Sequence, residues 1–412
     1  MNGELDLHKQ DWPYANLDEM AGQCIPQPGL IILFGSGETS PTGRKILEPV
    51  FRSLPASPRI ALLETPAGFE LNSHQVISRV GDFFSTRLQN FNPQVEIVPA
   101  RKRGTPYSPD DPDVVAPLLL ADLIFMGPGS PTYAVRQLHE SLAWYYLVAR
   151  HRLGAALALA SAATVAFSAC SLPVYEIYKA GEDIHWNQGL DFFKFYGLQP
   201  VFIPHWNNHE GGAELDTSRC FMGQERFVQL MEILPECMTV IGLDEKTALI
   251  MDPSRRECRV SGLGNVTLLH TGHKHILGSG LSSDPRLLQE FGRLNKDLTL
   301  VVEQRNSHVH QYRVGDSFPM AEIGPFHQYK PQANLPPHIW QAALRASSAR
   351  VSKVAEMPPD EIITLVRERN ESRRAGNWSI ADQLRVQIEQ LGWKVLDTID
   401  GPVCRKISTS KN

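Results

Sequence analysis

Residues 30–37 read Leu-Ile-Ile-Leu-Phe-Gly-Ser-Gly, five apolar residues that end in a glycine-containing turn. A strand buried on both faces of a parallel sheet has this pattern, because helices cover the sheet on either side. Further short apolar runs follow at 59–63, 95–98, 122–126, 155–159 and 200–203. Segments of helical length, for example 74–90 and 131–150, separate most of them. This alternation predicts an α/β fold with three layers, α/β/α, around a mainly parallel sheet.

The sequence changes character past residue 240. The apolar segments 247–251, 257–260 and 265–269 are short and separated by turns, which predicts antiparallel strands at the edge of the sheet. Residues 284–296 have a helical pattern, and 298–314 have the pattern of a hairpin.

We therefore expect five parts along the chain. They are an N-terminal arm (1–28), an α/β domain (29–280), an extension with strands and a helix (281–325), a linker rich in Pro, Ala and Ser with one short helix at 338–350 (326–359), and a helical hairpin (360–405).

Composition and charge exclude several classes of protein. The 412 residues carry 40 Lys and Arg against 45 Asp and Glu, a net charge of −5, so no positive field favours general nucleic-acid binding. The six cysteines lack the spacing of zinc or redox motifs, which favours reduced thiols in a cytoplasmic protein. We find neither a secretory signal nor an apolar run of membrane-spanning length, and we expect no membrane partner.

Ser161 is the strongest candidate for chemistry. It directly follows the apolar run 155–160 and precedes residues compatible with a helix. A serine at such a strand-to-helix turn projects its hydroxyl outward, and the N–H of Ala162 then lies near a helix N-terminus, where it can stabilise an oxyanion. Leu159 and Ala163 stand where this turn usually has glycines, so a purely structural serine stays an alternative.

A serine nucleophile needs a base, and the base needs an acid that orients it. His205 follows the apolar run that begins at residue 200, and so is expected at the carboxyl end of a strand. Glu176 and Asp183 lie between Ser161 and His205. We prefer Glu176 as the acid, and a surface position for either carboxylate stays open.

Two glycine-containing turns also follow strands. Gly127-Pro128-Gly129-Ser130 comes after the run 122–126, and its backbone N–H groups could face an oxyanion; an ordinary strand-to-helix turn is the alternative. Gly35-Ser36-Gly37-Glu38 is a weaker case of the same pattern, and it matches neither common nucleotide-binding motif.

Two groups of histidines raise a metal site as an alternative. They are His205 and His209 with Glu210, and the set His270, His273 and His275. Pro204 and the glycines at 211–212 make a helix across 205–209 improbable, so His205 and His209 need not share a face. We expect no metal and no organic cofactor.

These motifs occur in a recognisable order: Gly35–Glu38, Phe125–Gly129, Ala160–Ala163, Ile203–His205 and Gly242–Leu249. Over about 29–275 the chain resembles the peptidase family of aspartyl dipeptidase and cyanophycinase, which has a flavodoxin-like, class I glutamine amidotransferase-like fold. The resemblance implies a serine nucleophile at Ser161, a histidine base at His205, oxyanion amides in the turn with Gly127 and Gly129, and hydrolysis of amide bonds next to aspartyl residues.

The chain departs from that family at the site itself. Ser161-Ala162-Ala163 replaces Ser-Ala-Gly, and Gly127-Pro128-Gly129 replaces Gly-Gly-x. Pro204 stands where cyanophycinase has a substrate-binding glutamine. Specificity for cyanophycin or β-aspartyl bonds is therefore not carried over, and the segment 206–219 suggests a different pocket.

The tail resembles a second family. Leu365–Arg373, Asn377–Arg385 and Leu391–Thr398 are similar to the C-terminal helical domain of cysteinyl-tRNA synthetase, which lies near the tRNA anticodon. The chain has no HIGH or KMSKS motif and no zinc-binding cysteine set, so it is not expected to be an active synthetase. The tail has candidates for a basic stripe, with a solvated helical face as the alternative: Arg367, Arg369, Arg373, Arg374 and Arg385.

The leading hypothesis is a cytosolic serine hydrolase that cleaves a peptide or other small amide through Ser161, His205 and Glu176. The alternative is a catalytically inactive binding module, or an adaptor that contacts tRNA or a protein through 360–405. A homodimer remains open as its oligomeric state.

Overall fold

The computed structural model describes residues 26–271, 308–354, 359–398 and 401–406. The chain divides into two compact units, with the boundary between Leu344 and Arg345, and each unit is described by itself. The predicted N-terminal arm lies almost wholly outside the described residues, as does the predicted helix at 284–296.

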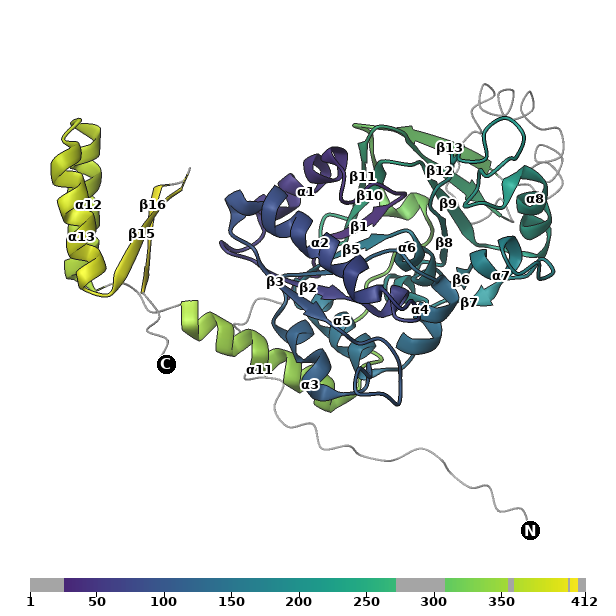
Figure 1. The fold of residues 1–412 in the computed structure, drawn as a ribbon, viewed down its shortest axis with the longest axis horizontal. Coiled ribbons are helices and arrows are strands. Elements are labelled where there is room, and N and C mark those ends of the chain that lie inside the picture. Colours follow the sequence, from purple (N-terminus) through teal and green to yellow (C-terminus); the bar gives the residue numbers. More distant parts are fainter. Residues whose placement is uncertain (1–25, 272–307, 355–358, 399–400, 407–412) are drawn as a thin grey trace, which may run out of the picture. The chain divides into compact units, whose positions relative to one another are not determined.

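The first unit is built on a mixed sheet of eight strands in the order β14-β11-β10-β1-β5-β4-β2-β3 (Figure 1). The strands β1, β5, β4, β2 and β3 are parallel, while β10, β11 and β14 extend the sheet with antiparallel pairs. This confirms the predicted α/β fold and the antiparallel edge formed by 247–251 and 257–260. The prediction is wrong for 265–269, which lies in a second sheet. The bounds are β1 (Ile31–Phe34), β2 (Arg59–Leu63), β3 (Gln94–Val98), β4 (Leu123–Met126), β5 (Ala156–Ala160), β10 (Thr247–Asp252), β11 (Glu257–Gly262) and β14 (Ser317–Pro319).

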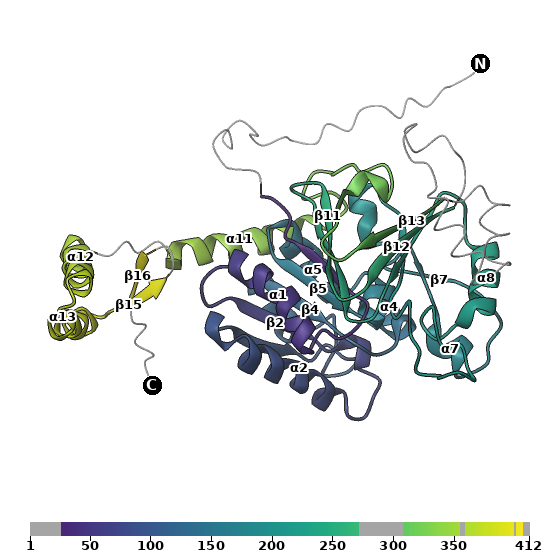
Figure 2. The same ribbon diagram turned by 90° about the horizontal axis from the view of Figure 1, so that it is seen from above.

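Helices cover both faces of this sheet (Figure 2). Ile32 and Phe34 of β1 lie in one core with α1 (Pro41–Ser53) and α2 (Ser73–Arg87). Ile31 and Leu33 face the opposite core, which contains α3 (Pro112–Val115), α4 (Pro131–Leu138), α5 (Leu142–Arg152) and α6 (Ala162–Ala166). Because successive strand residues point to opposite faces, a strand covered twice must be apolar throughout, as residues 31–34 are.

A second, four-stranded sheet corrects one prediction. Residues 200–203 form β8 (Pro200–Ile203), which lies in the order β13-β12-β9-β8 and not in the main sheet. The other strands are β9 (Thr239–Leu243), β12 (Asn265–His270) and β13 (His308–Arg313). Phe202 and Leu243 belong to the same core as the main sheet, so the two sheets pack together. An apolar run shows that a strand is buried but does not specify its partner, which is why the sequence misplaced β8.

Three predicted segments differ in detail. Residues 131–150 form two helices, because Glu140 has a φ of 55° and Ser141 caps α5 by accepting a hydrogen bond from Trp144 N–H. The part of 298–314 that is described is β13, which pairs with β12. The predicted linker contains an 18-residue helix, α11 (Pro337–Val354), and its Ile339 packs near Ala149 of α5.

Shorter elements complete the first unit: η2 (Thr65–Ala67), η3 (Gln89–Phe91), η4 (Ala116–Leu120), β6 (Cys170–Ser171), α7 (Val174–Tyr178), β7 (Asn187–Gln188), η5 (Phe192–Tyr196), α8 (Gly223–Ile233) and η6 (Met320–Glu322). In the portions of the chain that are described, no helix has both the length and the apolar character that crossing a bilayer requires.

The second unit holds the predicted helix pair and also two strands. These elements are α12 (Asp360–Arg374), α13 (Trp378–Gln390), β15 (Trp393–Thr398) and β16 (Gly401–Lys406). The helix pair and the break at 376–377 are confirmed, and the structure adds two strands that were not predicted; Trp393 and Val395 of β15 complete the core under the helices. The basic stripe is wrong in part: Arg369 is only 6% exposed, and Arg385 pairs with Glu389 at 3.2 Å.

Two leucine substitutions test the assignment of the core. Leu62→Ala removes a wholly buried side chain of β2 and should lower the free energy of unfolding of the first unit by about 2–5 kcal/mol. Leu71→Ala removes a fully exposed side chain and should change it by less than about 0.5 kcal/mol. Urea denaturation followed by circular dichroism measures both, and equal losses would contradict the assigned burial.

Candidate active site

Ser161 occupies a sharp turn between a buried strand and a short helix. β5 ends at Ala160, α6 begins at Ala162, and Ser161 between them has φ 52° and ψ −113°. A residue with a side chain rarely adopts this conformation, which costs about 1–3 kcal/mol. The turn holds although Leu159 and Ala163 replace the usual glycines, and Thr164 fixes the helix by donating to Leu159 O at 3.0 Å. Ser161 is thus held in the geometry of a nucleophile elbow.

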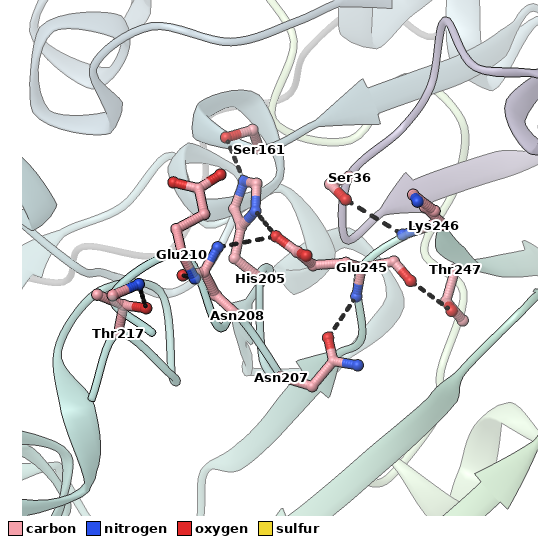
Figure 3. A network of polar contacts seen from close by, with 11 residues as sticks. Ser36, Ser161, His205, Asn207, Asn208, Glu210, Thr217, Glu245, Lys246 and Thr247 are labelled. Atoms are coloured by element: carbon pink, nitrogen blue, oxygen red, sulfur yellow. Dashed lines mark hydrogen bonds and ion pairs between the residues drawn. The ribbon is translucent and has the colours of Figure 1, made fainter. Parts of the chain in front are cut away.

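His205 follows the last residues of β8, as predicted, and its ring meets Ser161. The distance from Ser161 Oγ to His205 Nε2 is 3.1 Å (Figure 3). His205 also has a positive φ of 51°, and its N–H donates to Gly35 O at 3.1 Å. The structure therefore brings together the two residues that the sequence proposed as nucleophile and base.

The carboxylate beside His205 is Glu245, so the expectation of Glu176 is wrong. His205 Nδ1 lies 3.1 Å from Glu245 Oε1, while Glu176 lies on α7 and Asp183 is exposed in the loop after it. The reason is the parallel pairing of β8 with β9, which sets the residues after both strands side by side. Glu245 lies in the 242–249 motif, after His205 in the chain and so outside the interval between Ser161 and His205 in which the acid was expected.

Two asparagines hold Glu245 in place. Asn208 Nδ2 donates to Glu245 Oε1 at 2.9 Å, and the N–H of Glu245 donates to Asn207 Oδ1 at 2.8 Å (Figure 3). Burial opposes ionisation of Glu245, but the hydrogen bonds from Asn208 and His205 and the positive charge of Lys246 outweigh it and hold its pKa below the ordinary value. The carboxylate is therefore charged and oriented towards His205 Nδ1.

The turn after β1 supports this arrangement by joining the two loops. Its Gly35 accepts the His205 N–H, and Ser36 Oγ accepts the N–H of Lys246 at 3.1 Å. A Cβ on Gly35 would lie 2.1 Å from Asp244 O, so only glycine allows this close approach of the two loops. The Gly-Ser-Gly motif thus joins the loop of His205 to the loop of Glu245.

Residues 219–221 form a left-handed turn that contacts both the backbone and the ring of His205. Arg219, Cys220 and Phe221 have φ values of 56°, 60° and 68°. The N–H of Cys220 donates to His205 O at 3.2 Å, and the Phe221 ring lies 5.8 Å from the His205 ring. Arg219 donates to Trp206 O at 2.8 Å and stacks over the Trp206 ring. Three consecutive strained residues therefore fix the position of the histidine.

The turn at 127–130 is shaped by close packing. Gly129 has a φ of 143°, and a Cβ there would lie 2.0 Å from Pro66 O. Ser130 N–H donates to Pro66 O at 3.0 Å, while within the described residues the N–H of Gly129 donates to no protein acceptor. Gly127 begins this turn directly after β4. Ala162 is the first residue of α6, so its N–H has no intrahelical acceptor.

The histidine groups do not assemble a metal site in the described residues. No cluster of three or more His, Cys, Asp or Glu side chains with suitable geometry occurs among them. Both ring nitrogens of His205 already have partners, Ser161 and Glu245, and no helix forms across 205–209. His270 is buried and contacts Thr239, whereas His273 and His275 lie outside the described residues.

Two known proteins are similar to parts of this chain, one in structure and one in sequence. No protein-family model matches the chain. A peptidase from an acI-B1 Actinobacterium has a similar structure, with a TM-score of 0.50 and 19% identity, over 72% of this chain and 98% of that one. This likeness supports the α/β fold. A cysteine–tRNA ligase from Methanosarcina mazei is 40% identical over 55 residues, 13% of this chain, and the chain spans 12% of the length of that relative.

The lowered pKa of Glu245 predicts how its contribution to stability depends on pH. A carboxyl group whose pKa is lower in the folded state stabilises the fold above its unfolded pKa, about 4.3, and loses that effect as pH falls through the folded pKa. Below about pH 5, the difference in unfolding free energy between wild type and Glu245→Gln should therefore shrink as the pH falls. Urea denaturation at each pH measures it. Glu182→Gln, at an exposed position, is the control and should show little difference at any pH; a Glu245 difference that grows towards low pH would contradict the assignment.

Proposed function

We propose that the first unit is a serine hydrolase that cleaves a peptide or other amide bond. The observation that carries the proposal is the continuous path from Ser161 Oγ through the His205 ring to Glu245, with 3.1 Å at each step. A strained serine at a strand-to-helix turn, a histidine within proton-transfer distance and a carboxylate that orients it are the parts of a nucleophilic relay.

Ser161 is the nucleophile of the proposed reaction, and His205 transfers its protons. With its ring proton on Nδ1, facing Glu245, His205 leaves Nε2 free to accept the Ser161 proton as Oγ attacks the carbonyl carbon. The tetrahedral intermediate collapses when His205 gives that proton to the leaving amine, and the C–N bond breaks. Water then attacks the acyl-serine ester and passes a proton to His205. His205 donates that proton to Ser161 Oγ as the ester bond breaks, which regenerates the serine.

The negative oxygen of the intermediate requires donors that are already in place. The N–H groups of Ala162 and of Gly129 or Gly127 are our candidates, because they follow β5 and β4, which are adjacent parallel strands. The mechanism requires no metal or organic cofactor. The likeness to the actinobacterial peptidase supports an amide bond as the substrate.

Active-site labelling tests the nucleophile. A fluorophosphonate probe should label the wild-type protein, and Ser161→Ala should abolish the labelling, because the probe needs an activated serine hydroxyl. Ser53→Ala removes a serine hydroxyl at the end of α1, away from the relay, and should leave labelling unchanged.

Either of two results would overturn this assignment. Labelling that persists in Ser161→Ala would place the nucleophile elsewhere. A wild-type protein that is not labelled at all would favour the inactive binding module, and retention of tRNA by the full chain at two salt concentrations would then test contact through 360–405.

A second pair of variants tests the acid. Glu245→Gln keeps the size of the side chain but removes the charge that stabilises protonated His205, so the rate of labelling should fall by about 10²–10⁴. Glu176→Gln should leave that rate within about twofold, because Glu176 does not contact His205. Stopped-time labelling followed by in-gel fluorescence measures both, and the reverse order of effects would restore Glu176 as the acid.

A further inference from the structure

A surface cavity of about 600 Å³, widely open to solvent, lies between α7 and the segment that follows η2. Its size is that of a pocket for an amino-acid side chain or a small ligand. The lining residues are Phe69, Glu70, Tyr175, Glu176, Lys179 and Ala180.

One wall of this cavity is continuous with the candidate oxyanion turn. The Phe69 ring packs against Tyr133 of α4, with 5.3 Å between the ring centroids. Tyr133 N–H in turn donates to Ser130 Oγ, and Ser130 N–H donates to Pro66 O in η2. The segment that carries Phe69 and Glu70 is therefore attached directly to the turn at 127–130.

The other wall reaches the histidine. Tyr178 of α7 packs on Phe221 at 5.4 Å, and Phe221 packs on His205 at 5.8 Å. Tyr175 lies within electrostatic reach of Cys220, whose N–H donates to His205 O. Contacts from both walls of the cavity therefore lead to the candidate active site, although none of the residues of the relay lines the cavity itself.

The polar groups of the cavity are mainly acidic. Glu176 Oε2 is buried and has no hydrogen-bond partner in the described residues, an arrangement that costs free energy. Burial raises the pKa of Tyr175, and the negative charges of Glu70 and Glu176 raise it further. Both carboxylates are therefore close enough to interact with the Tyr175 hydroxyl. One cation is present: Lys179 is exposed, with Nζ 4.7 Å from the centre of the Tyr175 ring, and forms no ion pair among the described residues.

We propose that this cavity binds the side chain of a lysine or arginine next to the amide bond that is cleaved. The inference rests on the proposed hydrolase function and adds its substrate class. The two carboxylates and one ammonium give the cavity a net charge of −1, which a cationic side chain that pairs with Glu70 and Glu176 would neutralise. The faces of Phe69 and Tyr175 add favourable contacts for the aliphatic part and for the cation.

Matched peptides test this specificity. We would compare peptides that carry lysine, arginine, norleucine or glutamate at either position flanking the cleaved bond, and follow cleavage by liquid chromatography and mass spectrometry. Lysine or arginine at one of the two positions should raise kcat/KM at least about 10-fold over norleucine, which has a similar length but no charge. A preference for glutamate, with Lys179 as its partner, or no preference at all would overturn the proposal.

Variants assign the effect to the cavity. Glu176→Gln should reduce kcat/KM for the lysine peptide about 10-fold and leave the norleucine peptide within about twofold; Glu70→Gln is an independent second variant with the same expectation. Glu176→Lys should reverse the preference in favour of the glutamate peptide. Glu182→Gln removes a nearby carboxylate that does not line the cavity, and should not alter the ratio of lysine to norleucine.

Fluorophosphonate labelling separates this inference from the function on which it rests. If Ser161 is labelled but Glu176→Gln lowers cleavage of all peptides equally, or labelled wild-type protein cleaves none of them, the cavity assignment fails while the nucleophile stands. If wild-type Ser161 is not labelled, the hydrolase proposal fails and this inference fails with it.

Discussion

The parallel pairing of β8 with β9 is the interaction on which the candidate site depends. It sets Ile203 opposite Gly242, so that the chain leaves both strands at the same edge and His205 meets Glu245. The β1 loop then joins these two loops through Gly35 and Ser36. Parallel strands place all their carboxyl ends on one side, which is why three loops distant in sequence converge there.

Backbone strain is concentrated around this convergence. Ser161, His205 and residues 219–221 all have positive φ, although none is glycine. Such conformations persist only where the surroundings fix them. Here the surroundings are a wholly buried β5, the hydrogen bond from His205 N–H to Gly35 O, and the one from Cys220 N–H to His205 O. The hydroxyl and the imidazole are therefore oriented before any substrate binds, which lowers the cost of reaching a reactive geometry.

The sequence predicted the parts that local patterns determine. Apolar runs located β1 to β5, and the residue after a run located Ser161 and His205, because a strand end projects its next side chain from the sheet edge. It could not predict that β8 belongs to a second sheet, since burial is the same in either sheet. The wrong sheet for β8 and the wrong carboxylate beside His205 have the same cause. Which strand pairs with β8 depends on contacts between residues distant in sequence, and only the pairing with β9 indicates that Glu245 lies beside His205.

The helix that lines the cavity is separate from the strands that hold Ser161, His205 and Glu245. α7, which lines the cavity, lies between Ser161 and His205 in sequence, yet within the described residues none of its side chains bonds to either of them or to Glu245. The relay is held instead by β5, β8 and β9 and by the loops at their ends. Substitutions across 174–180 can therefore reshape the cavity and leave the contacts among Ser161, His205 and Glu245 in place.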